Sequence, residues 1–449
     1  MSLMVGVSGI RGIVGETMTP QLAVRAACAM GAFCDKGRVL VGRDSRPSGT
    51  MLRSAVISGL LASGCEVIDL GVITTPGVGV MVGRLHAAGA LMLTASHNPA
   101  PWNGIKFITA DGSAPSEPVA RRIIDIFEGD AFALADHDHI GTPRTDDGGP
   151  QHHVDTVLKI VDADTVRRQG FHVVLDSVNG SGGPTGRGLL ERLGCRVTHI
   201  NGDPTGRFAH TPEPIAENLT GLGDEVRRSG AHVGFAQDPD ADRLAVVDET
   251  GAFIGEEYTF ALGAMRVLET RPGPVAANLS TSRMIDDIAA RMGSGCTVHR
   301  SPVGEANVVA AMKEHQCVVG GEGNGGLIDP RVVDIRDSMT SMAIILELMA
   351  TRGQPLSDIV ATIPRYVMVK QKFPCDRPRI GRVLERLRTA FDDARVSTID
   401  GVRMDWPTGW VHVRGSNTEP IMRVIGESAD DRSAERLVEK VRRVVDQVE

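Results

Sequence analysis

The chain has 449 residues, of which 42% are apolar and 23% charged, an ordinary composition for a folded, soluble protein. Domains average about 100–200 residues, so this length predicts three or four of them. The net charge of −8 argues against nucleic acid or an anionic membrane as the main partner.

The seven cysteines form no C-x-x-C pair, and their number is odd. This pattern favours reduced, mostly buried thiols over a disulfide framework, and with them a cytoplasmic location. The longest apolar run, residues 339–350, contains Glu347 and is too short to span a bilayer. We therefore expect a cytoplasmic protein without a membrane partner.

One pattern occurs three times along the chain: a short apolar strand, a polar turn, a helix, a glycine and a second strand. The copies begin at residues 39–41, 173–175 and 275–277. Each copy is a βαβ unit, which predicts a parallel sheet, and the glycine after each helix is a C-cap signal. The spacing exceeds the period of a solenoid, which is about 20–50 residues. The sequence therefore predicts three related α/β domains in tandem, with mixed or parallel sheets.

The last segment follows a different pattern. Residues 396–405 and 410–414 are predicted to form a hairpin, followed by a strand at 421–427 and a helix at 432–448. This is a small α+β domain. We expect the domains to surround a central cleft, because ligand sites often lie between domains. The predicted domains are residues 1–148, 149–250, 251–366 and 367–449.

The first stretch that suggests chemistry is Thr94-Ala95-Ser96-His97-Asn98-Pro99, which follows an apolar strand. A hydroxyl at the end of a strand, beside an imidazole and within loop reach of Lys106, suits nucleophilic or phosphoryl chemistry. The same residues also suit a simple polar turn that ends at the proline. A serine-hydrolase site is disfavoured, because Ser96 has no G-x-S-x-G elbow around it.

Three aspartates, Asp238, Asp240 and Asp242, occupy alternating positions in a loop between two apolar strands. Carboxylates at this spacing can converge on one cation, and ligands that are all oxygen favour Mg²⁺ over Zn²⁺. An EF-hand is disfavoured, because the loop lacks the required glycine and the distal glutamate. An acidic surface turn is the alternative interpretation.

Five glycines surround Glu322 and Asn324 in residues 320–326. A carboxylate and an amide can form hydrogen bonds with sugar hydroxyls. The stretch matches neither the P-loop nor the dinucleotide-binding glycine pattern. A loop without any ligand is the alternative.

A fourth stretch, Arg414-Gly415-Ser416-Asn417-Thr418, lies between two predicted strands of the last domain. A guanidinium, two hydroxyls, an amide and exposed backbone N–H groups can together hold a phosphate. An ordinary turn is the alternative interpretation.

These four stretches, in this order, resemble those of the α-D-phosphohexomutase superfamily. The resemblance covers essentially the whole chain, including residues 6–15 with Arg11. It implies a phosphomutase that interconverts hexose 1-phosphate and hexose 6-phosphate through a phosphoserine. The implied cofactors are Mg²⁺ and a hexose 1,6-bisphosphate intermediate or activator. The implied partner is a small sugar phosphate, and the enzyme would be a monomer or a homodimer.

The resemblance also implies roles for individual residues. The implied catalytic residues are Ser96, His97, Lys106 and Arg11, with Ser96 carrying the phosphoryl group. The implied metal ligands are Ser96, Asp238, Asp240 and Asp242. The implied substrate-binding residues are Arg243, Glu322, Asn324, Arg414, Ser416, Asn417 and Thr418.

The glycine-rich stretch departs from the pattern of many bacterial members, which have serine in place of Asn324 and histidine in place of Gly326. Its form looks most like that of archaeal-type phosphoglucosamine mutases, which implies glucosamine phosphate as the substrate. Mannose or glucose phosphate is the alternative. A sugar-phosphate sensor without activity and a metal-dependent phosphatase are hypotheses from two other functional classes.

Overall fold

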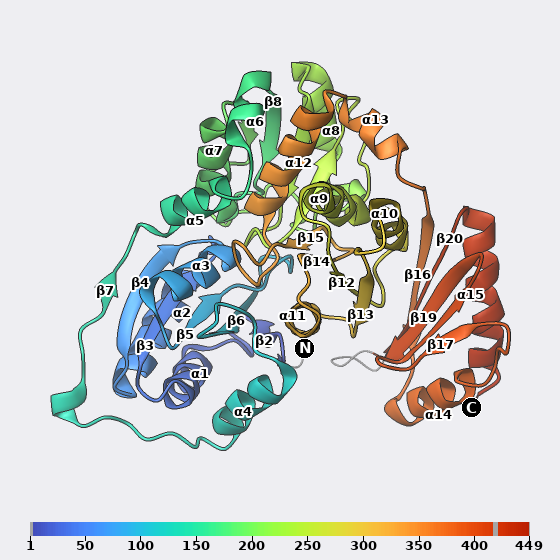
Figure 1. Cartoon of the computed structure of the whole chain (residues 1–449). Helices are drawn as coiled ribbons and strands as arrows, with labels where there is room; N and C mark the ends of the chain where they lie inside the picture. The colour runs from blue at the N-terminus through green and yellow to red at the C-terminus, as the bar shows by residue number, and fades with distance from the viewer. Residues whose placement is uncertain (1–2, 416–420, 449) are drawn as a thin grey trace.

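A computed structural model describes residues 3–415 and 421–448, which are organised around four β-sheets (Figure 1). Three sheets contain parallel strands, and the fourth is antiparallel throughout. The expected fold class, three related α/β domains followed by an α+β domain, is therefore confirmed. The exact domain boundaries stay predictions. No helix in the described part of the chain is long and apolar enough to cross a membrane.

The first sheet has seven strands in the order β1–β2–β6–β5–β3–β4–β7. The strands are β1 (Met4–Gly6), β2 (Gly9–Ile13), β3 (Arg38–Arg43), β4 (Glu66–Val72), β5 (Gly89–Leu93), β6 (Trp102–Thr109) and β7 (Arg144–Thr145). The helices are α1 (Pro20–Phe33), α2 (Gly49–Ala62), α3 (Thr75–Leu85) and α4 (Glu117–Glu128). Val39 and Val41 pack in one core with α1 and α2, whereas Leu40 packs in a second core with α3. Helices thus cover both faces of β3, which explains why the strand is a continuous apolar run.

The second and third sheets have four strands each, in the orders β11–β10–β8–β9 and β13–β12–β14–β15. The second-domain elements are α5 (Gly149–Leu158), α6 (Ala163–Gln169), β8 (His172–Asp176), α7 (Gly182–Arg192), β9 (Arg196–Ile200), α8 (Thr220–Ser229), β10 (Val233–Gln237) and β11 (Leu244–Val247). The third-domain elements are α9 (Glu256–Thr270), β12 (Val275–Asn278), α10 (Met284–Met292), β13 (Val298–Ser301), α11 (Glu305–Glu314), β14 (Val319–Glu322), β15 (Gly326–Ile328), α12 (Ser338–Arg352) and α13 (Leu356–Ala361).

A four-strand unit is shared by the first three sheets. Its spatial order is β4–β3–β5–β6 in the first, β9–β8–β10–β11 in the second and β13–β12–β14–β15 in the third. In each unit three strands are parallel, and the fourth pairs antiparallel with the third. This common plan is the structural form of the repeat found in the sequence.

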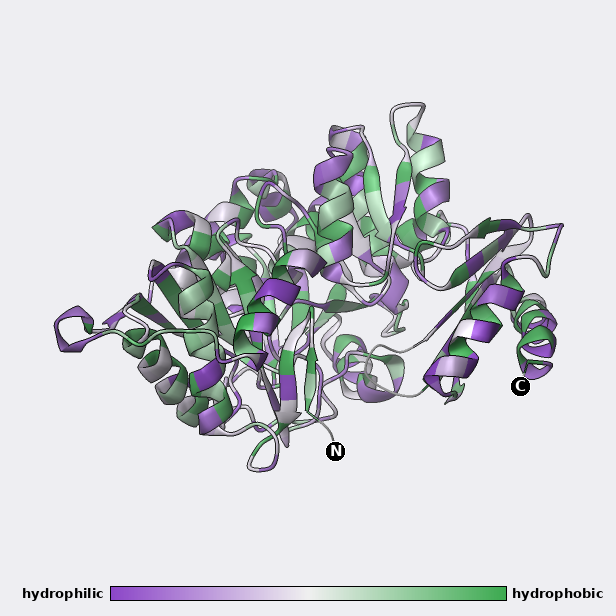
Figure 2. Cartoon of the chain, turned by 90° about the horizontal axis from the view of Figure 1, so that it is seen from below, coloured by the Kyte–Doolittle hydropathy of each residue, from purple (hydrophilic) through white to green (hydrophobic). Residues whose placement is uncertain are grey.

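Helix α12 joins the second and third domains, because it packs against α5, α6 and α7 as well as against α9. All its residues from Ser338 to Ala350 are buried. The apolar run that was too short for a membrane is therefore an interdomain core helix. Figure 2 shows how apolar and polar residues are distributed over the other elements: the strands are largely apolar, and the helices carry polar residues on their outer faces.

The fourth sheet has the order β16–β20–β19–β18–β17. Its elements are β16 (Val367–Pro374), α14 (Arg377–Leu387), β17 (Arg395–Ser397), β18 (Val402–Trp406), β19 (Gly409–Gly415), β20 (Ile421–Ser428) and α15 (Asp431–Asp446). The single strand expected at 396–405 is wrong, since β17 and β18 are separate antiparallel strands. Gly401 has a φ of +62° between them, and a Cβ there would lie 2.2 Å from the carbonyl oxygen of Val413. Such a turn ends the first strand.

Candidate active site

Three of the four motifs occupy equivalent places in the three related domains, namely the connection from the third to the fourth strand of the shared unit. Ser96 lies between β5 and β6, the three aspartates lie between β10 and β11, and Glu322 ends β14 just before Asn324. These connections follow the carboxyl ends of parallel strands, where α/β domains commonly bind ligands.

Ser96 lies in direct contact with Asp238, although the two residues are 142 positions apart. Asp238 belongs to the loop that carries the three aspartates, the acidic loop. Oγ of Ser96 donates a hydrogen bond of 2.9 Å to Oδ2 of Asp238, and Nδ1 of His97 lies 3.4 Å from the same Oγ. Ser96 has a left-handed backbone with a φ of +49° and is only 2% exposed. A non-glycine residue in this conformation is strained, so its surroundings must hold it there.

Arg46 supplies much of that support, and nothing in the sequence pattern singled it out beyond its place in the polar turn that follows β3. The side chain is 1% exposed, and its Nη2 donates 2.7 Å hydrogen bonds to the carbonyl oxygens of Ser96 and Asn98. Its Nε pairs with Oδ2 of Asp44 at 3.0 Å. Because one rigid guanidinium binds several carbonyl oxygens of the loop, it fixes the path of the backbone around Ser96.

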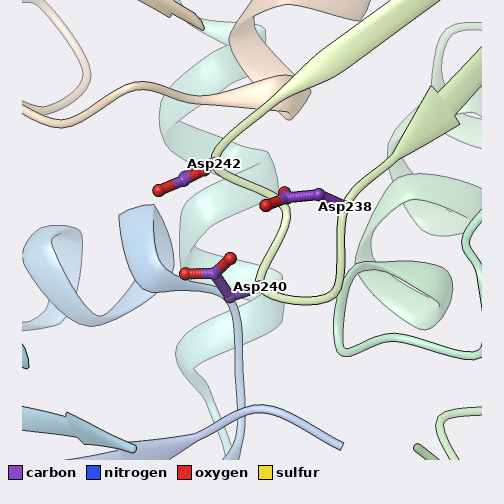
Figure 3. A group of neighbouring side chains, drawn as sticks. All are labelled: Asp238, Asp240 and Asp242. Atoms are coloured by element: carbon purple, nitrogen blue, oxygen red, sulfur yellow. The ribbon is translucent and has the colours of Figure 1, made fainter. Parts of the chain in front are cut away.

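The three aspartates turn their carboxylates toward the same side of their loop (Figure 3). Each is completely buried, and one oxygen from each lies within 4.8 Å of the others. Oδ1 of Asp240 and Oδ1 of Asp242 have no hydrogen-bond partner in the described structure. Burial and then the charges of Asp242 and Asp240 raise the pKa of Asp238. Buried carboxylate oxygens that lack hydrogen-bond partners and repel one another are suitable ligands for a hard divalent cation such as Mg²⁺.

Positively charged side chains from other segments partly neutralise this loop. Nζ of Lys106 donates to Oδ2 of Asp240 at 2.7 Å and to Oδ2 of Asp242 at 3.0 Å. Burial alone would lower the pKa of Lys106, but Asp240 and Asp242 raise it above its usual value. Burial would raise the pKa of Asp242, but Arg336, Lys106 and Arg243 together lower it. Lys106 is therefore an ammonium and Asp242 a carboxylate at neutral pH.

His97 and Arg11 lie beside this centre. Nη1 of Arg11 donates to Oδ1 of Asn98 at 3.2 Å, next to the imidazole in the chain. Burial, followed by the charges of Arg243 and Arg11, lowers the pKa of His97 to about 2. The imidazole is therefore neutral at physiological pH.

The glycine-rich stretch holds Glu322 firmly. Its Oε1 accepts hydrogen bonds from Nδ2 of Asn278 at 2.7 Å and from the backbone N–H of Gly304 at 3.1 Å. Its Oε2 accepts from Nη1 of Arg336 at 3.0 Å. Oδ1 of Asn324 is buried without a partner in the described structure, so this amide has spare hydrogen-bonding capacity.

A cavity of about 640 Å³ lies between the first and third domains. Its lining contains Glu322 and Asn324 of the glycine-rich stretch and most of the cationic residues of the site. The predicted site residues in the lining are Arg11, His97, Lys106, Arg243, Glu322 and Asn324. Ser96 and the three aspartates are nearly inaccessible and do not line it. Its volume suits a sugar phosphate, since small-molecule sites usually measure about 300–1,000 Å³.

Arg414 lies at the contact between the fourth and third domains. Its Nε is 3.2 Å from Oδ2 of Asp400, which also accepts a 3.0 Å hydrogen bond from the backbone N–H of Val303. Val303 lines the cavity, but Arg414 does not. Ser416, Asn417 and Thr418, predicted to hold a phosphate with Arg414, lie outside the described residues.

Known proteins resemble this chain over its whole length. Models of the phosphoglucomutase/phosphomannomutase α/β/α domains I, II and III and of the C-terminal domain match residues 2–134, 151–251, 255–366 and 371–444. A protein of Methanopyrus kandleri named "Probable phosphoglucosamine mutase" is 41% identical, over 99% of this chain and 98% of its own length. A "Phosphoglucomutase/phosphomannomutase" of Thermococcus kodakarensis is 37% identical, over 98% and 97%. A crystal structure of a phosphoglucomutase/phosphomannomutase family protein from Burkholderia thailandensis superimposes with a TM-score of 0.86, at 27% identity and 98% coverage of both chains.

Proposed function

The chain belongs to the phosphoglucomutase/phosphomannomutase family, and on that premise we propose that it is a phosphohexomutase acting through Ser96. The observation that carries this proposal is the hydrogen bond from Ser96 to Asp238. It joins the hydroxyl of the first domain to the acidic loop of the second, directly beside a cavity lined by cations. Phosphoryl transfer needs such positioning and charge neutralisation more than covalent help from many groups.

The reaction starts from a phosphoryl group on Ser96. The bond between phosphorus and the serine oxygen breaks, a bond from phosphorus to the free hydroxyl of the sugar phosphate forms, and the hydroxyl proton ends on Oγ. We assign His97 to assist this proton transfer, because its Nδ1 lies 3.4 Å from Oγ. The product is a hexose 1,6-bisphosphate. After it turns over in the cavity, the other phosphoryl group returns to Ser96 by the reverse chemistry.

Asp238, Asp240 and Asp242 would hold Mg²⁺ together with Ser96. The ion would supply positive charge against a phosphoserine that adds about −1.5 to −2 charge to three carboxylates. Arg11 and Lys106 add fixed positive charge on the side of the first domain. The two buried aspartate oxygens without partners support this role for the loop.

The proposed substrate is glucosamine phosphate, converted from the 6-phosphate to the 1-phosphate. Glu322 and Asn324 would bind the sugar hydroxyls, and Arg243 and Arg414 would contact phosphate. Support comes from the relative at 41% identity that is named "Probable phosphoglucosamine mutase". Phosphomannomutase or phosphoglucomutase activity is the alternative, supported by the relative at 37% identity.

A coupled assay tests both levels of the proposal. Glucosamine, glucose and mannose 6-phosphates are supplied at equal concentration with Mg²⁺ and catalytic hexose 1,6-bisphosphate, and formation of each 1-phosphate is measured. We expect the highest kcat/KM for glucosamine 6-phosphate and no turnover by Ser96→Ala. Release of inorganic phosphate in excess of isomerisation would instead identify a phosphatase. Binding of sugar phosphate without any turnover would identify a sensor.

A further inference from the structure

Arg336, between β15 and α12, makes ion pairs with three segments that are separate in the sequence. Its Nη2 lies 2.9 Å from Oδ2 of Asp242, in the acidic loop. Its Nη1 lies 3.0 Å from Oε2 of Glu322, in the glycine-rich stretch 320–326 that we assign to the sugar and call the sugar loop. Its Nε lies 2.9 Å from Oε2 of Glu305, at the start of α11. The side chain is only 9% exposed, so these contacts form largely away from water.

The geometry of these pairs requires an arginine. Each of its three guanidinium nitrogens binds a different carboxylate, which uses the full width of the planar group. A lysine ammonium is a single point and cannot reach three carboxylates placed around a plane. Oε1 of Glu322 accepts hydrogen bonds from Asn278 and Gly304. Among the described residues, Arg336 is the cation that binds Oε2 of Glu322.

Gly326 makes room for this arginine. A Cβ added at Gly326 would lie 2.1 Å from Cδ and 2.8 Å from Cγ of Arg336. The backbone of Gly326 is an ordinary strand at the start of β15, and it does not have a positive φ. Space, and not backbone conformation, therefore excludes a side chain at this position while Arg336 is in place.

We propose that Arg336 is a positioning residue that fixes the sugar-binding carboxylate of Glu322 relative to the acidic loop, and that Gly326 is the space through which it reaches both. This inference rests on the proposed function, since it assigns Glu322 to the sugar and Asp242 to the metal. One cation then joins the carboxylate that we assign to the sugar to the loop that we assign to the metal. The pairing between Gly326 and Arg336 distinguishes this sugar loop from one that carries a side chain at residue 326.

Steady-state kinetics of Arg336→Met and Arg336→Lys test the positioning role. Glu322 would contact the sugar before and during the reaction, so its displacement weakens binding of both states equally. We expect KM for the sugar phosphate to rise about tenfold to a hundredfold in Arg336→Met, with kcat changed by only a few fold. Arg336→Lys should recover part of the loss. The Mg²⁺ concentration for half-maximal rate should not rise, because Arg336→Met removes a positive charge beside Asp242 that would repel the metal ion.

A matched control is Arg331→Met, since Arg331 lies in the same connection and pairs with Asp329 but does not line the cavity. It should leave KM unchanged. Equal KM values for wild type and Arg336→Met, or equal losses in sugar and Mg²⁺ binding, would overturn the positioning role. Inactive wild-type protein would instead refute the proposed function itself, so the two failures are distinguishable.

A double-mutant cycle tests the spatial part without relying on activity. Gly326→Ala should lower the melting temperature clearly when Arg336 is present. In the Arg336→Ala background the same change should cost much less, because the clashing Cγ and Cδ atoms are gone. Additive changes in melting temperature would show that Gly326 and Arg336 do not share this space, and would overturn that half of the inference.

Discussion

Two regions of the molecule join distant segments with different chemistry. One is the centre where Ser96 meets the three aspartates, and the other is the contact between the third and fourth domains. In the centre, Lys106 and Arg336 pair with completely buried carboxylates. The domain contact instead combines hydrogen bonds, such as Ser280 Oγ to His412 Nδ1 at 2.9 Å and the backbone N–H of Arg283 to Oε1 of Glu427 at 3.0 Å, with a partly exposed ion pair between Lys370 and Glu256.

The difference indicates which part of the molecule is fixed. Separating buried charges leaves each one without a partner, at a cost of about 3–5 kcal/mol per broken pair. A hydroxyl or a backbone N–H that leaves its acceptor can bond to water instead, so the net cost is about 1 kcal/mol for a neutral acceptor and about 1.5–3 kcal/mol for a carboxylate. The first three domains therefore form the rigid side of the cleft. We expect the fourth domain to be the part that shifts during the proposed turnover of a bisphosphate.

The largest expected effect is on stability, from Arg46→Met. The change leaves Asp44 buried without its cation and frees the carbonyl oxygens around Ser96. We expect the free energy of unfolding of the first domain to fall by about 3–5 kcal/mol, measured by urea denaturation of the full chain. Arg25→Met is the control, since its pair with Asp130 is exposed, and it should change stability by less than about 1 kcal/mol. Similar losses of stability in the two variants would contradict the view that buried ion pairs make the first domain rigid around Ser96.

Asp240→Asn tests the charge of the acidic loop. The amide keeps the shape but removes a negative charge that faces Lys106 and that we assign to Mg²⁺. We expect kcat to fall about a hundredfold to a thousandfold and the half-saturating Mg²⁺ concentration to rise. Asp224→Asn, an exposed change in the same domain, should do neither. An unchanged metal titration in Asp240→Asn would refute its role as a ligand.

Asp400→Asn tests the contact between the fourth and third domains. The carboxylate holds Arg414 and accepts from the backbone N–H of Val303, so it links the fourth domain to the edge of the cavity. Hydrogen bonds to a charged group are worth about 1.5–3 kcal/mol, which predicts KM for sugar phosphate about tenfold higher. The free energy of unfolding should fall by no more than this amount. Asp393→Asn, on an exposed pair with Lys440, is the control. A loss of stability without a change in KM would show that this contact is purely structural.

The smallest effect concerns pH. Burial lowers the pKa of His412 to about 4, from an ordinary value of 6.5. Below pH 6.5 the unfolded chain therefore binds a proton that the folded chain does not. Stability from this group is complete above pH 6.5 and is lost as the pH falls toward 4, by up to about 1.4 kcal/mol for each pH unit. Urea denaturation at pH 7 and pH 5 should show a smaller pH dependence for His412→Gln than for wild type.

The sequence predicted the fold class and the four motif loops because their signals are local. A strand, a turn, a helix and a glycine lie within one short stretch, and each motif directly follows an apolar strand. Arg46 and Arg336 carried no such signal, because their partners come from other segments and domains. The turn at Gly401 was also missed, since only the nearby carbonyl oxygen of Val413 shows why a side chain is excluded there.

Transfer of a labelled phosphoryl group tests most directly whether Ser96 carries the phosphoryl group. The protein is incubated with hexose 1,6-bisphosphate labelled in its phosphates, separated from free sugar, and then mixed with unlabelled hexose 6-phosphate. We predict one label on the peptide that contains Ser96, its transfer to sugar on mixing, and no label on Ser96→Ala. A label on another residue, or one on Ser96 that stays on the protein after mixing, would contradict the account.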